Sequence, residues 1–228
     1  MSADLYSSVS GATAVWTRMQ TLSNNIANVN SNGFKAGRIA FEVTGPNSST
    51  LGQSYVMPTE VKLDMSDGHL IETGNPMDFA IRGEGFFSVG ENMLTRDGRF
   101  QLNEDRKLVT YDGKTVQGVG GAIEVPLDET IRISDDGRVF ASESGEIDRL
   151  QILKGDARPI GENLWRPEGE MRAVEEGFQI RQGAVEGSNV DPMIAMVELV
   201  EASRYFQAYQ KAMQGSDAMN ARLNRIGR

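Results

Sequence analysis

The sequence offers few side chains that could carry out covalent chemistry. It contains no cysteine and a single histidine, His69, among 228 residues. Thiolate nucleophiles, disulfides, iron–sulfur clusters and cysteine zinc sites are therefore excluded, and a metal site built from several histidines cannot form. A Ser-His-Asp triad would have to use His69, which lies beside a predicted turn. Catalysis would rest mainly on carboxylates.

The remaining candidates for chemistry are two carboxylate pairs and two glycine-rich runs. Asp135-Asp136 and Glu175-Glu176 are adjacent residues, which point in different directions on a strand and are more typical of solvated edges than of an acid–base pair. The runs Arg82-Gly83-Glu84-Gly85 and Gly118-Val119-Gly120-Gly121 neither complete a phosphate-binding motif nor open an evident helix. We expect both runs to be turns, and we expect no catalytic, cofactor-binding or metal-ligating residue and no cofactor.

The charge of the chain is unevenly distributed. The formal net charge is −9, which opposes a general role in nucleic-acid binding because phosphate contacts need a basic surface. Residues 1–40 carry +2 and residues 188–228 carry +1, so the middle carries −12. This pattern favours an acidic, solvent-facing central region flanked by two nearly neutral ends that serve as contact surfaces, although chance is an alternative.

The first 30 residues carry a helical hydrophobic pattern. Alternate steps of four and three select a row in which only one residue is polar: Leu5, Val9, Ala12, Trp16, Met19, Ser23 and Ile26. A second row, formed by Val15, Leu22 and Val29, widens the stripe so that the helix can contact more than one neighbour. The other face carries neutral polar residues instead of charged pairs, which favours close packing against further protein surfaces.

A second long helix is predicted at the C-terminal end. Asp191 offers a capping carboxylate and Pro192 suits the first helical turn. The same count selects Ala195, Leu199, Ala202, Phe206, Tyr209, Met213, Ser216, Asn220 and Leu223. The two helices could pair with each other and complete an ordinary two-helix layer. Apolar residues outside the two rows, such as Val15 and Val29 in one helix and Met196 and Val200 in the other, favour assembly between chains instead.

The middle of the chain reads as a small β domain. Asp-Gly pairs at 67–68, 97–98, 112–113 and 136–137 are typical of tight hairpin turns. They separate short β-prone segments at 86–89, 107–111, 130–133 and 150–153. We therefore predict an α+β fold in which N- and C-terminal amphipathic helices form a coiled-coil-like layer and the centre is mainly antiparallel β.

Four regions follow from these patterns. We predict an assembly helix over 1–35, a β-rich domain over 66–187 and a second assembly helix over 188–228. The region between them, 36–65, is expected to be a flexible connector because residues 42–60 include Gly45-Pro46, Ser48, Ser49 and Gly52. Residues 1–20 lack the basic and apolar regions of a cleaved signal peptide, and no run approaches the roughly 20 apolar residues of a membrane span.

Several stretches of this sequence resemble bacterial flagellar rod and hook proteins. The longest is Leu22-Ser23-Asn24-Asn25-Ile26-Ala27-Asn28-Val29-Asn30-Ser31-Asn32-Gly33-Phe34-Lys35. Two more follow in the order of that family: Thr73-Gly74-Asn75-Pro76-Met77-Asp78-Phe79-Ala80-Ile81 leading into Gly83-Glu84-Gly85-Phe86-Phe87, and Thr95-Arg96-Asp97-Gly98-Arg99-Phe100. A fourth is Glu186-Gly187-Ser188-Asn189-Val190-Asp191, followed by a helix that contains Ala202-Ser203-Arg204-Tyr205. These anchors span almost the whole chain.

The resemblance implies a structural, non-enzymatic part of the flagellar basal body. Such a protein would be exported through the flagellar type III channel without a cleaved signal peptide and would polymerise helically in the periplasmic rod. Its partners would be copies of itself, other rod proteins and the export apparatus, with no nucleic acid and no direct membrane insertion. The short spacer between Phe41 and Gly68 favours a proximal rod member over a distal rod member or another axial part.

In this family the terminal helices form an inner tube. The resemblance therefore implies that the apolar rows of the two helices make the contacts between subunits. The expected assembly contacts are Leu5, Val9, Trp16, Met19, Leu22, Ile26, Leu199, Phe206, Tyr209, Met213 and Leu223. A competing hypothesis is a cell-wall hydrolase, because any structure that crosses the periplasm must pass peptidoglycan. Such an enzyme needs two converging carboxylates, and no spacing in the sequence identifies them.

Overall fold

The computed structural model describes the backbone of residues 2–44, 55–127, 129–161 and 163–226. Side chains are described for residues 9–40, 61–127, 129–161, 163–215 and 218. The chain divides into two compact units. The helical unit comprises Met1–Val29, Ala36–Asp64 and Val190–Arg228, and the β unit comprises Asn30–Lys35 and Met65–Asn189. The chain therefore passes from one unit to the other at four places.

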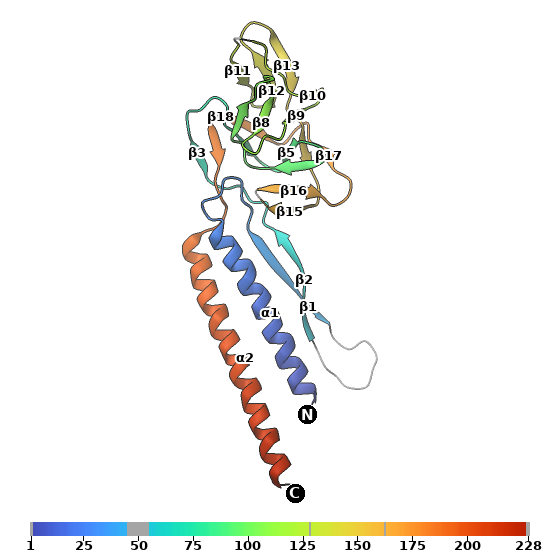
Figure 1. The fold of residues 1–228 in the computed structure, drawn as a ribbon, viewed down its shortest axis with the longest axis vertical. Coiled ribbons are helices and arrows are strands. Elements are labelled where there is room, and N and C mark those ends of the chain that lie inside the picture. The colour runs from blue at the N-terminus through green and yellow to red at the C-terminus, as the bar shows by residue number, and fades with distance from the viewer. Residues whose placement is uncertain (1, 45–54, 128, 162, 227–228) are drawn as a thin grey trace. The chain divides into compact units, whose positions relative to one another are not determined.

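The helical unit contains two long helices and one hairpin. Helix α1 (Ser2–Ala27) and helix α2 (Pro192–Ile226) run side by side in opposite directions (Figure 1). The Asp191 carboxylate accepts hydrogen bonds from the backbone N–H groups of Met193 and Ile194, at 2.9 and 3.1 Å, which confirms the predicted cap of α2. Neither helix, over its described residues, is both long and apolar enough to cross a bilayer.

The predicted flexible connector over 36–65 is wrong for most of its length. Strands β1 (Gly37–Thr44) and β2 (Tyr55–Leu63) pair antiparallel, with Gly37 opposite Leu63 and Thr44 opposite Tyr55. The physical reason is that apolar and β-branched residues recur along both segments, while Gly45-Pro46 and Gly52 lie outside both segments in the sequence. Part of the predicted connector, residues 45–54, lies outside the described residues.

The hairpin supplies a second neighbour for α1. It lies along α1 (Figure 1), and its first residue is held by a two-way hydrogen bond with a buried helix side chain. Asn25 Nδ2 donates to the Gly37 carbonyl at 3.0 Å, and the Gly37 N–H donates to Asn25 Oδ1 at 2.9 Å. The wide apolar stripe of α1 is thus explained in part by contacts inside the same chain.

The β unit is built from short strands whose pairings are antiparallel. The largest sheet has the order β15 (Ala157–Gly161), β16 (Leu164–Pro167), β6 (Met93–Thr95), β5 (Phe86–Val89), β14 (Ile152–Lys154) and β17 (Arg172–Ala173). A three-stranded sheet has the order β11 (Ile131–Ile133), β12 (Arg138–Ala141) and β13 (Gly145–Arg149).

Four two-stranded pairs complete this unit: β18 (Gln179–Gln182) with β4 (Phe79–Arg82), β19 (Ala184–Glu186) with β3 (Leu70–Glu72), β7 (Phe100–Leu102) with β8 (Leu108–Thr110), and β10 (Gly121–Ala122) with β9 (Gln117–Gly118). Buried side chains of β4, β5, β7, β8, β11, β12, β14, β16 and β18 meet in one core, in which the Phe100 ring lies 5.7 Å from the Phe79 ring and 5.1 Å from the Phe87 ring. The predicted α+β class with a mainly antiparallel centre is confirmed.

The four Asp-Gly pairs have two different structural roles. At Asp112-Gly113 and Asp136-Gly137 the chain forms hairpin turns, but only the glycine has positive φ, at 78° and 85°. These are turns closed by a left-handed glycine, and they differ from the type I′ turn, in which both central residues have positive φ. Gly68 and Gly98 do not form hairpin turns. A Cβ at Gly98 would lie 1.6 Å from the Phe79 carbonyl oxygen, so this glycine permits close backbone approach.

Candidate functional site

The predicted helical rows pack partly on each other within the chain. The Trp16 ring lies 5.6 Å from the Phe206 ring, and the Tyr209 ring occupies the space that a side chain at Gly11 would need. Arg18 and Glu198 form an ion pair at 3.7 Å beside this contact. Much of the predicted apolar row of each helix therefore contacts the other helix of the same chain. Contacts with other subunits would have to use the apolar surface that remains exposed.

The other predicted contact residues have different environments. Leu22 is buried, whereas Ile26 and Met213 are half-buried. Met19 and Leu199 lie together with Trp16 in an open groove of about 830 Å³ along the two helices, to which Ala27 and Val200 also contribute. The side chains of Leu5 and Leu223 lie outside the described residues. Val9 is 46% exposed and Trp16 is 48% exposed, so both retain free apolar surface in this chain.

The first half of α2 is apolar on two opposite faces. Ala195 and Ala202 are buried on the inner face toward α1. Because successive residues of a helix turn by about 100°, Met193 and Val197 lie on the opposite face, and Met196 and Val200 lie on the flank between that face and the groove, which Val200 also lines. We call these four residues the outer face of α2, and each is more than half exposed. A helix that is apolar on both sides normally has partners on both sides.

The predicted helical pattern covers only part of this outer face. It identified Met196 and Val200 as apolar residues outside the main row, but not Met193 and Val197. The signal was present, because 193 and 197 are four residues apart, as are 196 and 200. Counting one row per helix concealed a second row on the other side.

A buried ion cluster joins the family-like stretches of the sequence inside the β unit. Glu186 Oε1 accepts from Lys35 Nζ at 2.7 Å and Glu186 Oε2 accepts from Arg96 Nη1 at 2.9 Å. Arg96 also donates to the Gly83 carbonyl at 2.5 Å. Lys35 closes the first stretch and Glu186 opens the last, so residues that are far apart in the sequence converge on one carboxylate.

The cluster is almost inaccessible to water and its charges are unequal. The side chains of Lys35, Arg96 and Glu186 are at most 1% exposed, and together they carry two positive charges and one negative charge. Burial lowers the pKa of Lys35, and the neighbouring Arg96 adds to this effect while Glu186 opposes it. Arg96 also lies 5.8 Å from the centre of the Phe86 ring, a cation–π contact.

Both glycine-rich runs bind carboxylates of this chain. The Gly83 N–H donates to Asp67 at 3.2 Å, and the Gly120 N–H donates to Asp148 Oδ1 at 3.1 Å. A Cβ at Gly118 would lie 2.1 Å from the Asp148 carboxylate, so a side chain at this position would displace that carboxylate. These backbone donors therefore already have an internal anion, in agreement with the expectation that the runs are turns.

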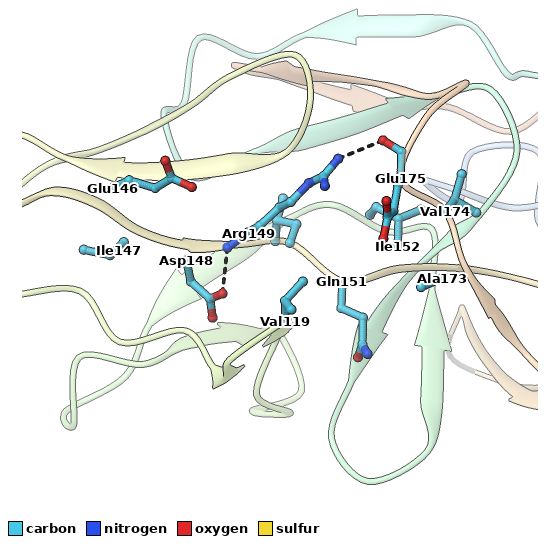
Figure 2. Close-up of a pocket in the computed structure, with 11 residues that line it drawn as sticks. Val119, Glu146, Ile147, Asp148, Arg149, Gln151, Ile152, Ala173, Val174 and Glu175 are labelled. Atoms are coloured by element: carbon cyan, nitrogen blue, oxygen red, sulfur yellow. Dashed lines mark hydrogen bonds between the residues drawn. The ribbon is translucent and has the colours of Figure 1, made fainter.

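The predicted carboxylate pairs are held in separate surroundings. Glu175 lines a hollow of about 570 Å³, in which its backbone carbonyl accepts from Arg149 at 2.8 Å (Figure 2). Asp135 lines a different hollow. Asp136 accepts from the Ser134 hydroxyl and from Arg138 Nε, and these bonds lower its pKa from 3.8 to about 2.

The single histidine has a surface position. His69 is exposed, its carbonyl accepts from the Gly187 N–H at 2.8 Å, and its ring lies against the backbone of Gly187. The structure therefore gives His69 a packing contact with the segment that follows Glu186.

Comparison with known proteins gives consistent matches along the chain. Residues 5–35 match the family described as flagella basal body rod protein. Residues 80–141 match the D1 domain of flagellar hook protein FlgE/F/G, and residues 181–226 match the C-terminal region of flagellar basal body rod FlgEFG protein. The helical ends and the β centre thus all match families of flagellar axial proteins.

Whole-chain relatives agree with these matches. The chain is 32% identical to flagellar basal-body rod protein FlgF of Mesorhizobium japonicum, over 91% of this chain and 90% of that protein. It is 32% identical to FlgF of Rhizobium meliloti, over 95% and 94%. It is 30% identical to the rod protein FlgG of Bacillus subtilis, over 98% of each chain. The chain belongs to the family of flagellar basal-body rod proteins, as a FlgF-like structural component of the rod.

Proposed function

We propose that this chain builds the proximal part of the rod and passes torque across the periplasm, with no enzymatic step. The observation that carries the proposal is the outer face of α2, where four apolar side chains remain exposed after the inner face has packed on α1. Burial of such side chains against neighbouring subunits supplies the driving force for assembly.

The helical unit offers two different surfaces for this assembly. One is the groove that contains Trp16, Met19 and Leu199, and the other comprises Met193 and Val197 on the far side of α2. Contacts between unlike surfaces of identical or related subunits generate an open helical array when the rotation does not close. In the proposed rod, α1 and α2 form a coiled-coil-like inner layer with helices of neighbouring subunits.

Helices are suited to carrying torque because their backbone hydrogen bonds are internal. Twist is then resisted by close-packed side chains, which leave little free volume for sliding. The predicted contacts Val9 and Trp16 on α1 remain candidates in this role, together with the outer face of α2. The proposed partners are other rod proteins and further copies of this chain.

A comparison of alignment lengths favours the proximal over the distal assignment. The alignment with FlgG of Bacillus subtilis covers 261 positions, more than the 228 residues of this chain, so it requires gaps of at least 33 positions in this chain. Alignments with four FlgF relatives cover 225–244 positions, and alignments with four FlgG relatives cover 248–261 positions. The absence of such an insertion supports a FlgF-like position in the rod.

Family membership also supports a route to the rod. We propose that the chain is exported through the flagellar type III apparatus without a cleaved leader, and that the apparatus is therefore a transient partner. The absence of cysteine is compatible with passage of an unfolded chain, because no thiol can cross-link during transit.

A cryo-electron microscopy map of intact basal bodies tests the proposed position. The experiment compares basal bodies from a strain that carries a small folded tag at exposed Tyr111 with basal bodies from the untagged strain. Extra density around the part of the rod nearest the rotor supports the proposal, and extra density only around the distal rod contradicts it. A peptidoglycan-cleavage assay on the purified chain tests the hydrolase alternative, for which we expect no product.

A further inference from the structure

We infer that the buried ion cluster is a mechanical clamp. Through it, a pulling force passes directly between residues 33–35, which follow α1, and residues 186–189, which precede α2. The clamp consists of Lys35, Arg96 and Glu186 and the backbone bonds that join residues 33–34, 66–68 and 186–189. This inference deepens the proposed torque-carrying role and rests on it for its biological meaning. The inference itself concerns the mechanical resistance of a single chain and can be tested on a single chain.

The backbone segments of the clamp lie next to the points at which the chain passes from one unit to the other. The chain crosses between the helical unit and the β unit after residues 29, 35, 64 and 189. Lys35 immediately precedes one crossing, Ser66 closely follows another, and Asn189 immediately precedes the last. The bonded residues are therefore those at which force from outside would enter the β unit.

The segments at these crossings are bonded to one another. The Gly33 N–H donates to the Glu186 carbonyl at 2.6 Å, and the Asn189 N–H donates to the Phe34 carbonyl at 3.4 Å. Lys35 Nζ donates both to Glu186 Oε1 and to the Ser66 carbonyl, at 2.7 Å each. One lysine thereby ties three passing segments together.

The middle segment, residues 65–69, is bonded to both of the other segments. The Gly68 N–H donates to Glu186 Oε1 at 2.9 Å, and Asn189 Nδ2 donates to the Ser66 carbonyl at 3.1 Å. A Cβ at Gly68 would lie 2.0 Å from the Gly187 carbonyl oxygen, so the segments touch along their backbones. The clamp therefore combines close backbone contact with charge-assisted hydrogen bonds, which are about twice as strong as neutral ones.

The mechanical consequence follows from the order of residues along the chain. Load that enters at residue 30 and leaves at residue 189 passes from residues 33–35 to residues 186–189 through the clamp. Residues 36–185, which include the β core, are bypassed while the clamp holds. These residues would add about 500 Å of extended chain if the load had to pass through them. The clamp thus keeps the shaft short and the β core unloaded.

Burial of an unbalanced charge fits a role beyond folding stability. Lys35 adds a second positive charge to the buried cluster, and its desolvation, together with the nearby Arg96, outweighs the favourable fields of Glu186 and Asp67, which a purely stabilising residue would avoid. Replacement by methionine leaves Arg96 and Glu186 as a balanced pair. We therefore expect Lys35→Met to fold while it weakens the mechanical link.

Force spectroscopy on single full-length chains tests the inference. Because the chain has no cysteine, handles can be attached uniquely through Asn30→Cys and Met193→Cys, both at exposed positions. We expect the first rupture of Lys35→Met to occur at about half the force of the parent chain, since charge-assisted bonds are lost. Later ruptures, which report the β core, keep their force. Glu84→Gln, which breaks the exposed ion pair with Lys154 in the same unit, is the matched control and changes no rupture.

The outcomes are distinguishable. An unchanged first rupture in Lys35→Met overturns the clamp, and so does an equal loss of force at every rupture, because the residue would then only stabilise the core. Should Lys35→Met fail to fold, hydrogen exchange of the parent chain decides: the Gly33 and Gly68 N–H groups must exchange as slowly as the β core. Faster exchange at either position overturns the inference. None of these results depends on where the protein lies in the rod.

Discussion

Replacement of exposed valine on the outer face of α2 separates assembly from folding. Val197 is 66% exposed, so contacts within the single chain bury only about a third of its surface. Full burial of such a side chain contributes about 1.5–3 kcal/mol, and the exposed two thirds are therefore worth about 1–2 kcal/mol if a neighbouring subunit covers them. Val197→Ser should reduce the assembly constant by a factor of about 5–30.

The same substitution should leave the isolated chain almost unaffected. Surface changes usually alter stability by less than about 0.5 kcal/mol. Leu22→Ala is the contrasting variant, because Leu22 is buried between elements of the helical unit. It should cost about 2–5 kcal/mol in the isolated chain. Urea denaturation followed by far-ultraviolet circular dichroism measures this difference.

The assay for assembly is swimming in soft agar together with a count of complete rods by electron microscopy. Val197→Ser alone should reduce swimming, and Met193→Ser with Val197→Ser should abolish it, because the losses accumulate along one face. Normal swimming and normal rod numbers in the double variant would refute the assignment of this face. A large loss of stability in the isolated double variant would refute it as well, since the face would then be part of the folded chain.

Three further predictions concern single residues and the order of the isolated protein. Gly33→Ala should destabilise the β unit by more than about 2 kcal/mol in urea denaturation, because φ is +69° and the new Cβ would meet the Arg96 backbone at 2.4 Å; Gly74→Ala, with φ of +71° and open space, should cost only about 1–2 kcal/mol. The Asp136 carboxyl should titrate by nuclear magnetic resonance near a pKa of 2, so its contribution to stability is complete above pH 3.8 and is lost as pH falls through 2; titration near 3.8 in the folded chain would contradict this. Limited proteolysis of the isolated chain should cleave the outer ends of α1 and α2 first and leave the β unit, residues 66–187 with the bonded segment 30–35, because helix ends without neighbouring subunits are marginal in water; cleavage of the β unit with intact helix ends would contradict it.

Local patterns were sufficient to predict the mainly antiparallel character of the β unit and a few of its strands. The segment 86–89 is strand β5, and the segments 107–111 and 130–133 contain β8 and β11. They were recognisable because turn glycines bracket short apolar runs. The hairpin of the helical unit was not recognised, because Gly45-Pro46 and the serines dominate a window in which Ile39 and Val61 belong to paired strands.

Contacts between distant residues could not be predicted in this way. Lys35, Arg96 and Glu186 were each visible inside a family-like stretch, but no periodicity relates residues that are separated by 61 and 90 positions. Periodicity also fails where a glycine serves close approach, as at Gly68 and Gly98, because the residue type is the same as in a turn. The family resemblance identified the segments that contain these three residues. Only the structure shows that their side chains contact one another.

Thiol labelling at the outer face of α2 tests the central claim most directly. The parent chain has no cysteine, so Val197→Cys and Tyr111→Cys each provide one reactive group, at positions that are 66% and 79% exposed. Both should react with a maleimide in the isolated chain. In intact basal bodies Val197→Cys should be protected while Tyr111→Cys still reacts. Equal labelling of Val197→Cys in the isolated chain and in the basal body would contradict the account.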